Sequence, residues 1–424
     1  MSTISSTVRH RLARWLLRGV RFPNGINSLS ELLGREATAA GVSVSPETAE
    51  ALPTVYACCR VIASAIASLP LQLHRRDGRG SRVAGDHPLH SVLHDQANAE
   101  STSYDLRYAL ACQRLLWGCA YGLIERNARG EAIALWPLES PRMRVRRDAD
   151  RRLVFEYYGP SGRKQTWTHD PYRPAILRWP INSLDGVTGR SVIGMLRESL
   201  GLSAAQERFA SRFFGNGTAF GGLLSSDDPL DDPDARNDLR KEIETQHAGP
   251  NKAHRLLVLG GGFKFTPFGV PPQDAQFLES RKFERSVIAG AFAVPPSMIG
   301  DLERATFSNV EHEAIRWLRD GLEPHLASFE QVIARDLIGP RASGELYARF
   351  NRAAAVRGDL KTRTESLATW RRLGVISPNE WRELEDWNPI SPADGGDDYV
   401  IIGGGAATPA GEAAPPSGAD GEKG

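Results

Sequence analysis

Two helical segments that enclose a compact insert constrain the fold of this chain more than any other feature. Apolar residues recur at spacings of three and four over residues 190–215 and again over 273–293. Residues 218–272 between them alternate strand-like and helix-like patterns, with strands expected at 222–224, 255–259 and 263–268 and a helix near 234–246. The sequence therefore predicts a small α/β module held between two long helices.

A polar loop follows the second of these helices. Pro295 and Pro296 cannot donate a helical hydrogen bond, so they predict the end of that helix. Ser308 and Glu311 have the spacing of a capping box, which predicts that a new helix begins at once. The loop at 295–308 holds residue types that often form a site: Asp301, Leu302, Glu303, Arg304, Thr306, Ser308 and Asn309.

The residues before the helix pair predict a mixed domain of helices and antiparallel strands. Helical spacing covers 46–69 and 103–116, and two β-like runs flank a turn at Asn127–Gly130, which predicts a hairpin. Further strands are expected at 143–147, 153–158, 165–168 and 175–179.

The residues after the loop predict one long helix and a smaller helical region. A buried face runs from Val310 to Leu337, and Pro324 inside it predicts a kink. A strand at 345–351, a helix at 359–373 and a short helix begun by Ser377 follow. Residues 403–424 are rich in Gly, Ala and Pro and are expected to be disordered.

The N-terminal residues 1–45 carry several arginines and no acid before Glu31, which predicts a flexible basic arm. Leu12, Trp15 and Leu16 could also share one face of a helix over residues 9–21 that lies on a membrane surface. No uninterrupted apolar run approaches the roughly 20 residues that a membrane span needs. The arm and the membrane-associated scaffold are therefore both kept as interpretations.

The charge balance limits the class of function. The chain has 424 residues, with 52 Lys and Arg against 51 Asp and Glu, a net charge of +1. This balance argues against a protein whose main work is to grip nucleic acid electrostatically, although not against one that touches DNA. Its four cysteines form no C-x-x-C pair, so we expect buried thiols in a reducing compartment.

The candidate catalytic or metal-binding patterns are weak. His87, His90 and His94 have a spacing seen in zinc sites but lack H-E-x-x-H, and Glu311–Glu313 ("EHE") cannot converge because adjacent helical residues point apart. The acidic loop lacks the glycine and distal glutamate of a calcium site, so it is expected to be solvated or to contact a basic partner; its residues are Asp227, Asp228, Asp231, Asp232 and Asp234. One alternative remains: a metal-dependent nuclease or phosphatase that uses Asp227, Asp228 and His312.

Seven segments occur in the order found in one family. They are "VYACCRVIASAIASLPLQLHRR", "HPLHSVLHDQAN", "LLWGCAYGLIERNARGEAIALWPL", "RFFGNGTAFGGLL", "FLESRKFERSVIAGAFAVPPSMIG", "TFSNVEHEAIRWL" and "LGVISPNEWRE". Over roughly residues 50–392 the chain resembles the portal proteins of tailed bacteriophages, the head–tail connectors at one capsid vertex.

The resemblance implies an α+β portal fold and a role for each segment. The expected parts are a mixed α/β wing (46–185), a first stem helix (186–217), a small α/β clip (218–272), a second stem helix (273–294), a tunnel loop (295–308), a long helix that returns to the wing (309–358) and a helical crown (359–402). Under this assignment the polar loop would project into a channel.

The resemblance also implies what the chain would bind. Family members form rings, typically of twelve subunits, through which double-stranded DNA passes during packaging and ejection. The expected partners are other copies of the chain, the terminase large subunit, the head–tail adaptor, and the major capsid and scaffolding proteins. The expected location is the portal vertex of a virion assembled in the bacterial cytoplasm, with no cofactor and no enzymatic activity.

Loop charge agrees with a conduit. Asp301, Glu303 and Arg304 sum to −1, so a ring of such loops would not hold a polyanion by releasing its counterions. A ring also needs two different faces of each subunit to meet. The arginines at 142–152 and the acidic segment at 227–244 offer two surfaces of opposite charge, which either meet between subunits or remain separate solvated patches.

Overall fold

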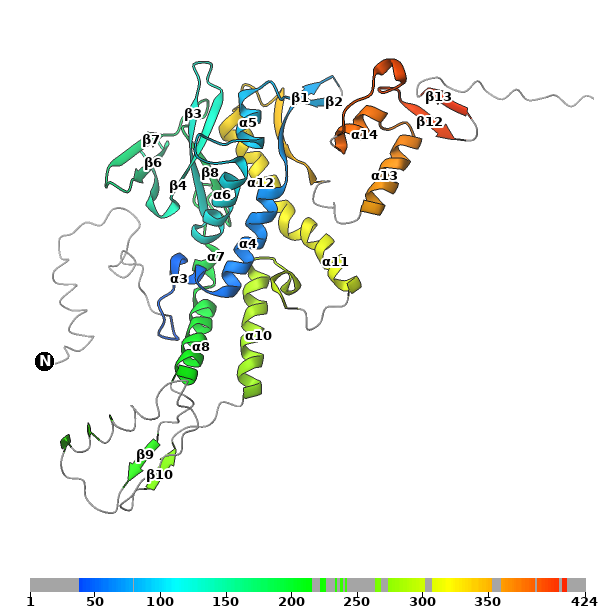
Figure 1. Ribbon diagram of the computed structural model, residues 1–424. Helices are drawn as coiled ribbons and strands as arrows, with labels where there is room; N and C mark the ends of the chain where they lie inside the picture. Colours follow the sequence, from blue (N-terminus) through cyan, green and yellow to red (C-terminus); the bar gives the residue numbers. More distant parts are fainter. Residues whose placement is uncertain are drawn as a thin grey trace, which may run out of the picture. The chain divides into compact units, whose positions relative to one another are not determined.

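The computed structural model divides into two compact units, Met1–Phe350 and Asn351–Gly424 (Figure 1). The structure describes residues 38–78, 80–215, 222–225, 233–234, 237–238, 241, 264–267, 274–301, 307–352, 360–385, 387–403 and 406–409. Helices and antiparallel sheets are both present in the first unit, as the predicted α+β class requires.

The start of the described chain corrects two predictions. Residues 38–45 were expected to belong to a flexible arm, yet Val42 and Val44 are buried. The helix predicted over 46–69 is two helices, α3 (Pro46–Glu50) and α4 (Pro53–Ser68). They are separate because Leu52 is extended before Pro53, a conformation that a following proline favours. The apolar face of α4 is buried as predicted.

Three antiparallel sheets form the body of the first unit. One has the strand order β11-β1-β2, one β4-β3-β8 and one β5-β6-β7. The hairpin predicted around Asn127–Gly130 is confirmed, with Tyr121 opposite Leu138 in its register. The bounds are β1 (Leu71–Asp77), β2 (Gly80–Val83), β3 (Cys119–Arg126), β4 (Ala132–Leu138), β5 (Met143–Arg147), β6 (Leu153–Tyr158), β7 (Lys164–Thr168), β8 (Ile176–Pro180) and β11 (Leu346–Phe350).

Two helices pack on the first two of these sheets. They are α5 (Pro88–His94) and α6 (Ser103–Trp117). Helix α6 begins with a capping box in which Thr102 and Asp105 exchange hydrogen bonds, and it ends at Gly118, which is left-handed. Its buried face packs on α4 and β3.

The helix pair follows the sheets in sequence. The segment predicted as one helix from residue 190 begins as the short helix α7 (Val192–Met195), which Ser191 caps, and continues as α8 (Arg197–Gly215). Strands β9 (Gly222–Ser225) and β10 (Lys264–Pro267) pair with each other, and α10 (Asp274–Ala291) follows. The described residues within 234–246 are helical, whereas the strand predicted at 255–259 lies outside the described residues.

The long helix is interrupted rather than smoothly kinked. It consists of α11 (Phe307–Trp317), a π-helical turn (Leu318–Leu322), α12 (Glu323–Ile333) and a second π-helical turn (Ala334–Ile338). Pro324 lies at the start of α12, so the interruption expected there is a π turn that precedes the proline. Ser308 is the second residue of α11, so the prediction that it caps this helix from outside is wrong.

The second unit holds α13 (Leu360–Arg372), α14 (Pro378–Leu384), β12 (Val400–Gly403) and β13 (Ala406–Pro409). The helix start predicted at Ser377 is confirmed, because Ser377 and Glu380 form a capping box. The tail expected to be disordered from residue 403 instead begins with a β12–β13 hairpin. β-branched residues at 400–402 favour a strand there and explain the error.

Candidate channel segment and its anchor

Helices α8 and α10 lie side by side in the first unit (Figure 1). Gln206 of α8 donates from Nε2 to Ser280 Oγ of α10 over 3.0 Å. The start of α8 is held by residues 38 and 39, since the Ala39 N–H donates to Glu198 Oε2 over 2.9 Å. A Cβ on Gly201 would lie 2.3 Å from Thr38 Oγ1, so glycine is needed for this close approach. The pair is therefore fixed to the rest of the unit at one end.

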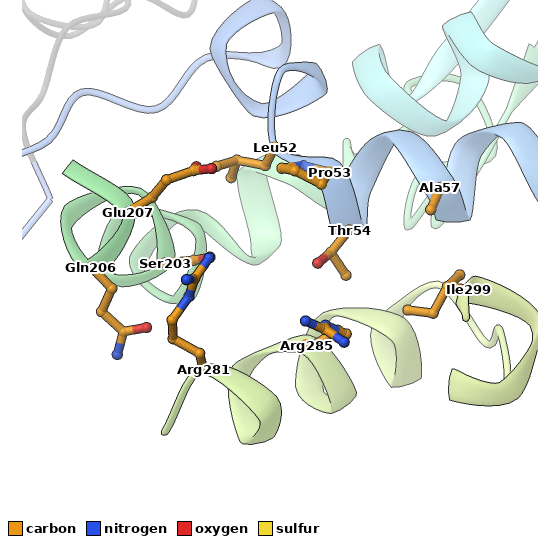
Figure 2. Close-up of a pocket in the computed structure, with 10 residues that line it drawn as sticks. All are labelled: Leu52, Pro53, Thr54, Ala57, Ser203, Gln206, Glu207, Arg281, Arg285 and Ile299. Atoms are coloured by element: carbon orange, nitrogen blue, oxygen red, sulfur yellow. The ribbon is translucent and has the colours of Figure 1, made fainter. Parts of the chain in front are cut away.

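The middle of α8, the start of α4 and one side of α10 enclose a groove of about 350 Å³ (Figure 2). Arg285 of α10 lies opposite Thr54 of α4, whereas Arg281 points toward Ser203 of α8. The groove is polar and open, and it joins the three helices where the pair meets the body of the unit.

Helix α10 ends through its own backbone, two residues before the prolines. Ala293 is left-handed with φ +54°, its N–H donates to Gly290 O, and the Val294 N–H donates to Ala289 O over 2.9 Å. This is a Schellman motif, which ends a helix without proline. The prediction that Pro295 and Pro296 stop the helix is therefore corrected: they begin the following 3-10 turn, Pro296–Ile299.

That turn leads into the predicted loop. Gly300 is left-handed with φ +90°, and the Asp301 N–H donates back to Pro296 O over 3.0 Å, so the chain reverses again. Ser297 Oγ donates to Glu313 Oε2 of α11 over 2.7 Å, which ties the turn to the helix after the loop. Asp301 is half-buried. Residues 295–301 are thus tied to α10 on one side and to α11 on the other.

The predicted loop residues divide into three groups. Asp301 follows the 3-10 turn, while Ser308 and Asn309 belong to helix α11 rather than to a loop. The remaining residues, Leu302, Glu303, Arg304 and Thr306, lie outside the described residues. Of the acidic loop, Asp227, Asp228, Asp231 and Asp232 also lie outside them, and Asp234 is exposed.

The first π turn packs against the end of α10. Gly321 is buried there, and a Cβ on it would lie 2.5 Å from Trp317 Cδ1 and 2.8 Å from Ala293 O. Only glycine lets the turn approach the Schellman motif so closely. The end of α10 and the long helix are therefore held as one structure.

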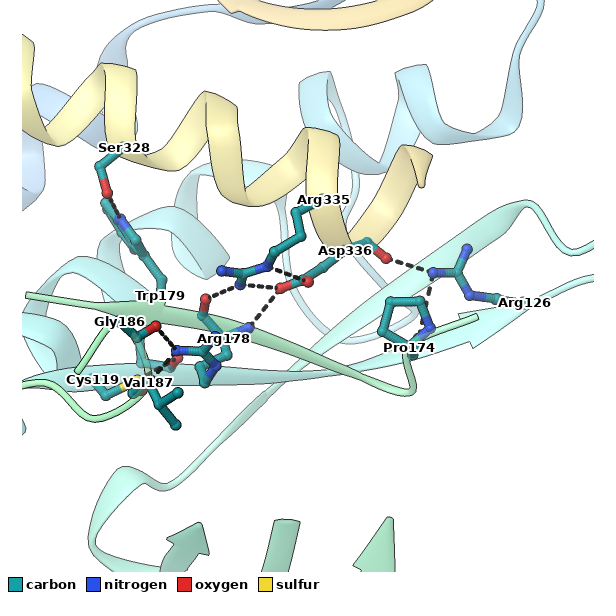
Figure 3. A network of polar contacts seen from close by, with 11 residues as sticks. Cys119, Arg126, Pro174, Arg178, Trp179, Gly186, Val187, Ser328, Arg335 and Asp336 are labelled. Atoms are coloured by element: carbon teal, nitrogen blue, oxygen red, sulfur yellow. Dashed lines mark hydrogen bonds and ion pairs between the residues drawn. The ribbon is translucent and has the colours of Figure 1, made fainter. Parts of the chain in front are cut away.

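The long helix is anchored at its far end by an ionic network (Figure 3). Asp336 is 1% exposed, and its Oδ2 accepts from the backbone N–H of Arg178 over 3.0 Å and from Arg335 Nη2 over 2.6 Å. Burial alone would lower the pKa of Arg335, but the bonds to Asp336 leave that pKa raised. Arg126 completes the anchor by donating from Nη2 to Asp336 O over 2.6 Å.

A second buried arginine joins α6, β8 and α12. Arg114 is 6% exposed, donates from Nε to Pro180 O over 3.0 Å, and lies 4.5 Å from the centre of the Trp179 ring. Its Nη1 contacts Nδ1 of His325, and no carboxylate of the described residues pairs with it. Burial lowers the pKa of Arg114 to about 9. Burial and the arginine charge together lower the pKa of His325 to about 3.

This contact predicts that acid destabilises the fold through His325. The unfolded histidine titrates near 6.5, so below that pH the unfolded chain binds a proton that the folded chain does not. Stability contributed by His325 is present above about pH 6.5 and is lost as pH falls toward 3, by about 1.4 kcal/mol per pH unit. Between about pH 7 and about pH 5, wild type should lose about 2 kcal/mol more than His325→Gln, which does not titrate.

Urea denaturation of both proteins at the two pH values measures this difference. The glutamine side chain in His325→Gln keeps an acceptor for Arg114, so the comparison isolates the titration. Burial also lowers the pKa of His74, His90 and His169, but these histidines are present in both proteins and cancel. An equal loss of stability in the two proteins would contradict the assignment.

The catalytic and metal alternatives gain no support from the described residues. His312 is exposed on α11, and Glu313 accepts from Ser297. His87 caps α5 by accepting from the Leu89 N–H over 3.1 Å, and His90 stacks on His94. No group of three potential metal ligands occurs within the described ranges. The four cysteines are free, and Cys58, Cys59 and Cys119 are buried, as expected for structural thiols.

Sequence reasoning missed the anchor residues Arg114, Arg126, Arg178 and Asp336. Asp336 and Arg178 are 158 positions apart, so no local pattern joins them. The one available signal was an acid beside the apolar positions Ile333 and Leu337 of a buried helical face. A charge in such a place needs a buried partner.

Comparison with known proteins identifies the arrangement. The family model for phage portal proteins matches residues 53–386. The chain belongs to the phage portal protein family. The portal protein of Enterobacteria phage HK97 is 30% identical over 356 residues, which cover 83% of this chain and 82% of that protein. The probable portal protein of Streptomyces phage phiC31 is 30% identical over 362 residues, 83% of this chain and 78% of that one.

Solved structures agree with the portal assignment. A chain from the neck of an empty gene transfer agent particle matches with a TM-score of 0.55 and 25% identity, over 80% of this portal chain and 91% of that chain. An HK97-family phage portal protein from Corynebacterium diphtheriae shares the fold, with a TM-score of 0.55 at 16% identity over 74% and 98% of the two chains. This portal protein is therefore a structural component of a phage-type particle.

Among the described residues, none of its helices is long and apolar enough to cross a membrane.

Proposed function

We propose that this portal protein assembles into a closed ring at one capsid vertex and that double-stranded DNA passes through the ring without sequence-specific contacts. The observation that carries the proposal is the α8–α10 pair, which leads into residues 295–301, a turn tied to both α10 and α11. The Schellman motif at Ala293 and the bond from Ser297 to Glu313 hold that segment in place. A loop that lines a channel needs such support because passing DNA pushes against it.

The proposed parts follow the helix pair. Residues 46–185 form the wing, 186–217 and 273–294 the stem, 218–272 the clip, and 295–308 the tunnel loop. Residues 309–358 return to the wing, and the crown spans 359–402. The division of the chain between Phe350 and Asn351 supports a separate crown, because that boundary lies close to its proposed start.

The proposed partners are proteins of the particle. They are further copies of the chain, typically twelve in all, together with the terminase large subunit, the head–tail adaptor, and the major capsid and scaffolding proteins. Gene transfer agent necks and virions among the similar structures support a neck location. The near balance of charge over the whole chain supports a conduit that lets DNA slide, and we propose no catalytic activity and no cofactor.

Light scattering and negative-stain imaging of the purified chain test the proposal. We expect closed rings with a central hole wide enough for duplex DNA, roughly 20 Å or more, at high protein concentration or on co-expression with the neighbouring capsid and scaffold proteins. Compact monomers under both conditions would overturn the proposal.

The same rings test the role of loop charge. Asp301→Arg combined with Glu303→Arg would line the hole with arginines, so these rings should retain a linear DNA duplex in a gel-shift assay at low salt and release it as salt rises. Glu100→Arg combined with Asp150→Arg makes the same charge change at exposed positions outside the stem. If both double variants bind DNA equally, the loop does not line the channel.

A further inference from the structure

A basic cavity of about 440 Å³ lies in the first unit, away from the helix pair. The start of α5, the turn between β3 and β4, the loop before β8 and the end of the long helix all contribute to it. Its arginines are Arg126, Arg129, Arg173 and Arg341, and its acids are Glu131 and Asp170. None of these residues belongs to the proposed channel.

The four arginines outnumber the two acids, and each acid is also held by a hydrogen bond from a neutral donor. Glu131 Oε2 accepts from Asn127 Nδ2 over 2.7 Å, and Asp170 Oδ1 accepts from the backbone N–H of Tyr172 over 2.8 Å. Burial and the charge of Arg173 both lower the pKa of Arg126. The cavity therefore holds an excess of positive charge, which an anion would relieve.

Unused donors point to the same conclusion. Nη1 and Nη2 of Arg126 donate to carbonyl oxygens, but its buried Nε has no partner among the described residues. Arg129 and Arg341 are exposed, and no ion pair holds either of them within the described ranges. Two guanidinium groups at the rim and one donor inside the cavity are thus available to a carboxylate, whose geometry fits the planar guanidinium.

The aromatic ring of Tyr172 lies beside the arginines of the cavity. Tyr172 is 61% exposed, and the Arg341 guanidinium lies 5.5 Å from the centre of its ring. A Cβ on Gly130 would lie 2.8 Å from Arg173 Nη2, so glycine lets Arg173 lie across the β3–β4 turn. The cavity can therefore contact both charged and apolar atoms of a ligand.

We infer that this cavity binds an acidic segment of another protein, with neighbouring carboxylates placed on Arg129 and Arg341 and an apolar side chain on Tyr172. A cavity of about 440 Å³ holds a few side chains, not a DNA duplex. The source of the segment, a capsid or scaffolding protein, rests on the proposed function, whereas the chemistry of the cavity does not.

Fluorescence anisotropy with the full chain tests the inference. The probe is a fluorescein-labelled peptide, Gly-Glu-Glu-Phe-Glu-Gly, and its control carries Gln at each Glu position. We expect the Glu peptide to bind and the Gln peptide to bind at least about tenfold more weakly, since charged pairs across an interface carry the recognition.

Charge-reversal variants locate the binding. Arg129→Glu combined with Arg341→Glu should weaken the Glu peptide at least about tenfold. Arg144→Glu combined with Arg152→Glu, at exposed positions outside the cavity, should change binding less than about twofold. Both cavity arginines are exposed, so the variant is expected to fold, and circular dichroism checks this. If it does not fold, Arg129→Glu alone is measured, with the same direction expected.

The remaining outcomes separate this inference from the proposed function. Equal binding of the two peptides, or equal weakening by the two double variants, would overturn the inference. Displacement of the bound peptide by a DNA duplex would assign the cavity to phosphate instead. Ring formation is imaged on the same samples. If rings form but do not bind the peptide, this inference is wrong and the proposed function stands. If the peptide binds to chains that never form rings, the proposed function is wrong and this inference stands.

Discussion

Asp336→Ala is expected to lower the free energy of unfolding by about 3 kcal/mol, the loss typical when one partner of a buried ion pair is removed. The carboxylate is 1% exposed and accepts from both the Arg178 backbone and Arg335. Its removal leaves the buried Arg178 N–H without an acceptor and leaves Arg335 with its bond to the Arg178 carbonyl oxygen but no carboxylate. Because Arg335 keeps a 40% exposed side chain, water offsets part of its loss, which places the effect at the lower end of the range.

The chain holds a matched control for this change. Arg319 and Asp320 are also adjacent in a π turn of the long helix, and Arg319 Nε donates to Asp320 Oδ1 over 2.8 Å. Asp320 is 49% exposed, so water screens its ion pair and Asp320→Ala should cost much less stability than Asp336→Ala. Thermal and urea denaturation of the full chain compare the two. If the two variants lose the same free energy of unfolding within error, burial does not determine how much the Asp336 network stabilises the fold.

Gly189→Ala should have a larger effect, a loss of more than about 3 kcal/mol or a failure to fold. A Cβ at this position would lie 1.6 Å from Gly118 O and 3.0 Å from Ile181 N. Both atoms are backbone and already bonded, because the Ile181 N–H donates to Gly118 O over 2.8 Å. No side chain can turn aside, so the segment that leads into α7 must move away from α6.

The displacement should reach the helix pair. Ser191 caps α7 and donates to Leu116 O, so moving residue 189 also breaks the start of α7 and loosens α8 after it. Hydrogen exchange should therefore rise over residues 191–215, and the yield of soluble protein should fall. Gly194→Ala is the control: its Cβ would meet only Ser191 Cβ at 3.8 Å within α7, and alanine favours a helix. Normal exchange in Gly189→Ala would contradict the packing argument.

Elements with a strong local signal were predictable. The β3–β4 hairpin followed from its turn, the burial of α4 from its apolar spacing, and the start of α14 from the Ser377–Glu380 pair. Each depends on residues a few positions apart, so the sequence carries the whole cause. The order of seven such segments was enough to indicate the family.

Predictions failed where backbone geometry decides. The prolines at 295 and 296 are a visible stop signal, but Ala293 ends α10 first by adopting a left-handed conformation. Ser308 has the spacing of a cap, yet α11 begins at Phe307. Alanine carries no sequence signal of a Schellman motif, which usually has glycine at that position. Local composition therefore leaves such boundaries open by a few residues.

The sequence by itself determined most of the elements, their order and the family, because periodicity, turn residues and caps act over a few neighbouring positions. Only the tertiary structure decided which residues anchor the long helix and where the arginines gather into a basic cavity. Asp336 meets Arg178 across 158 positions, and the basic cavity takes its residues from four separate segments. Such contacts depend on how sheets and helices pack, and a buried charge is stabilised only by the partner that packing brings to it.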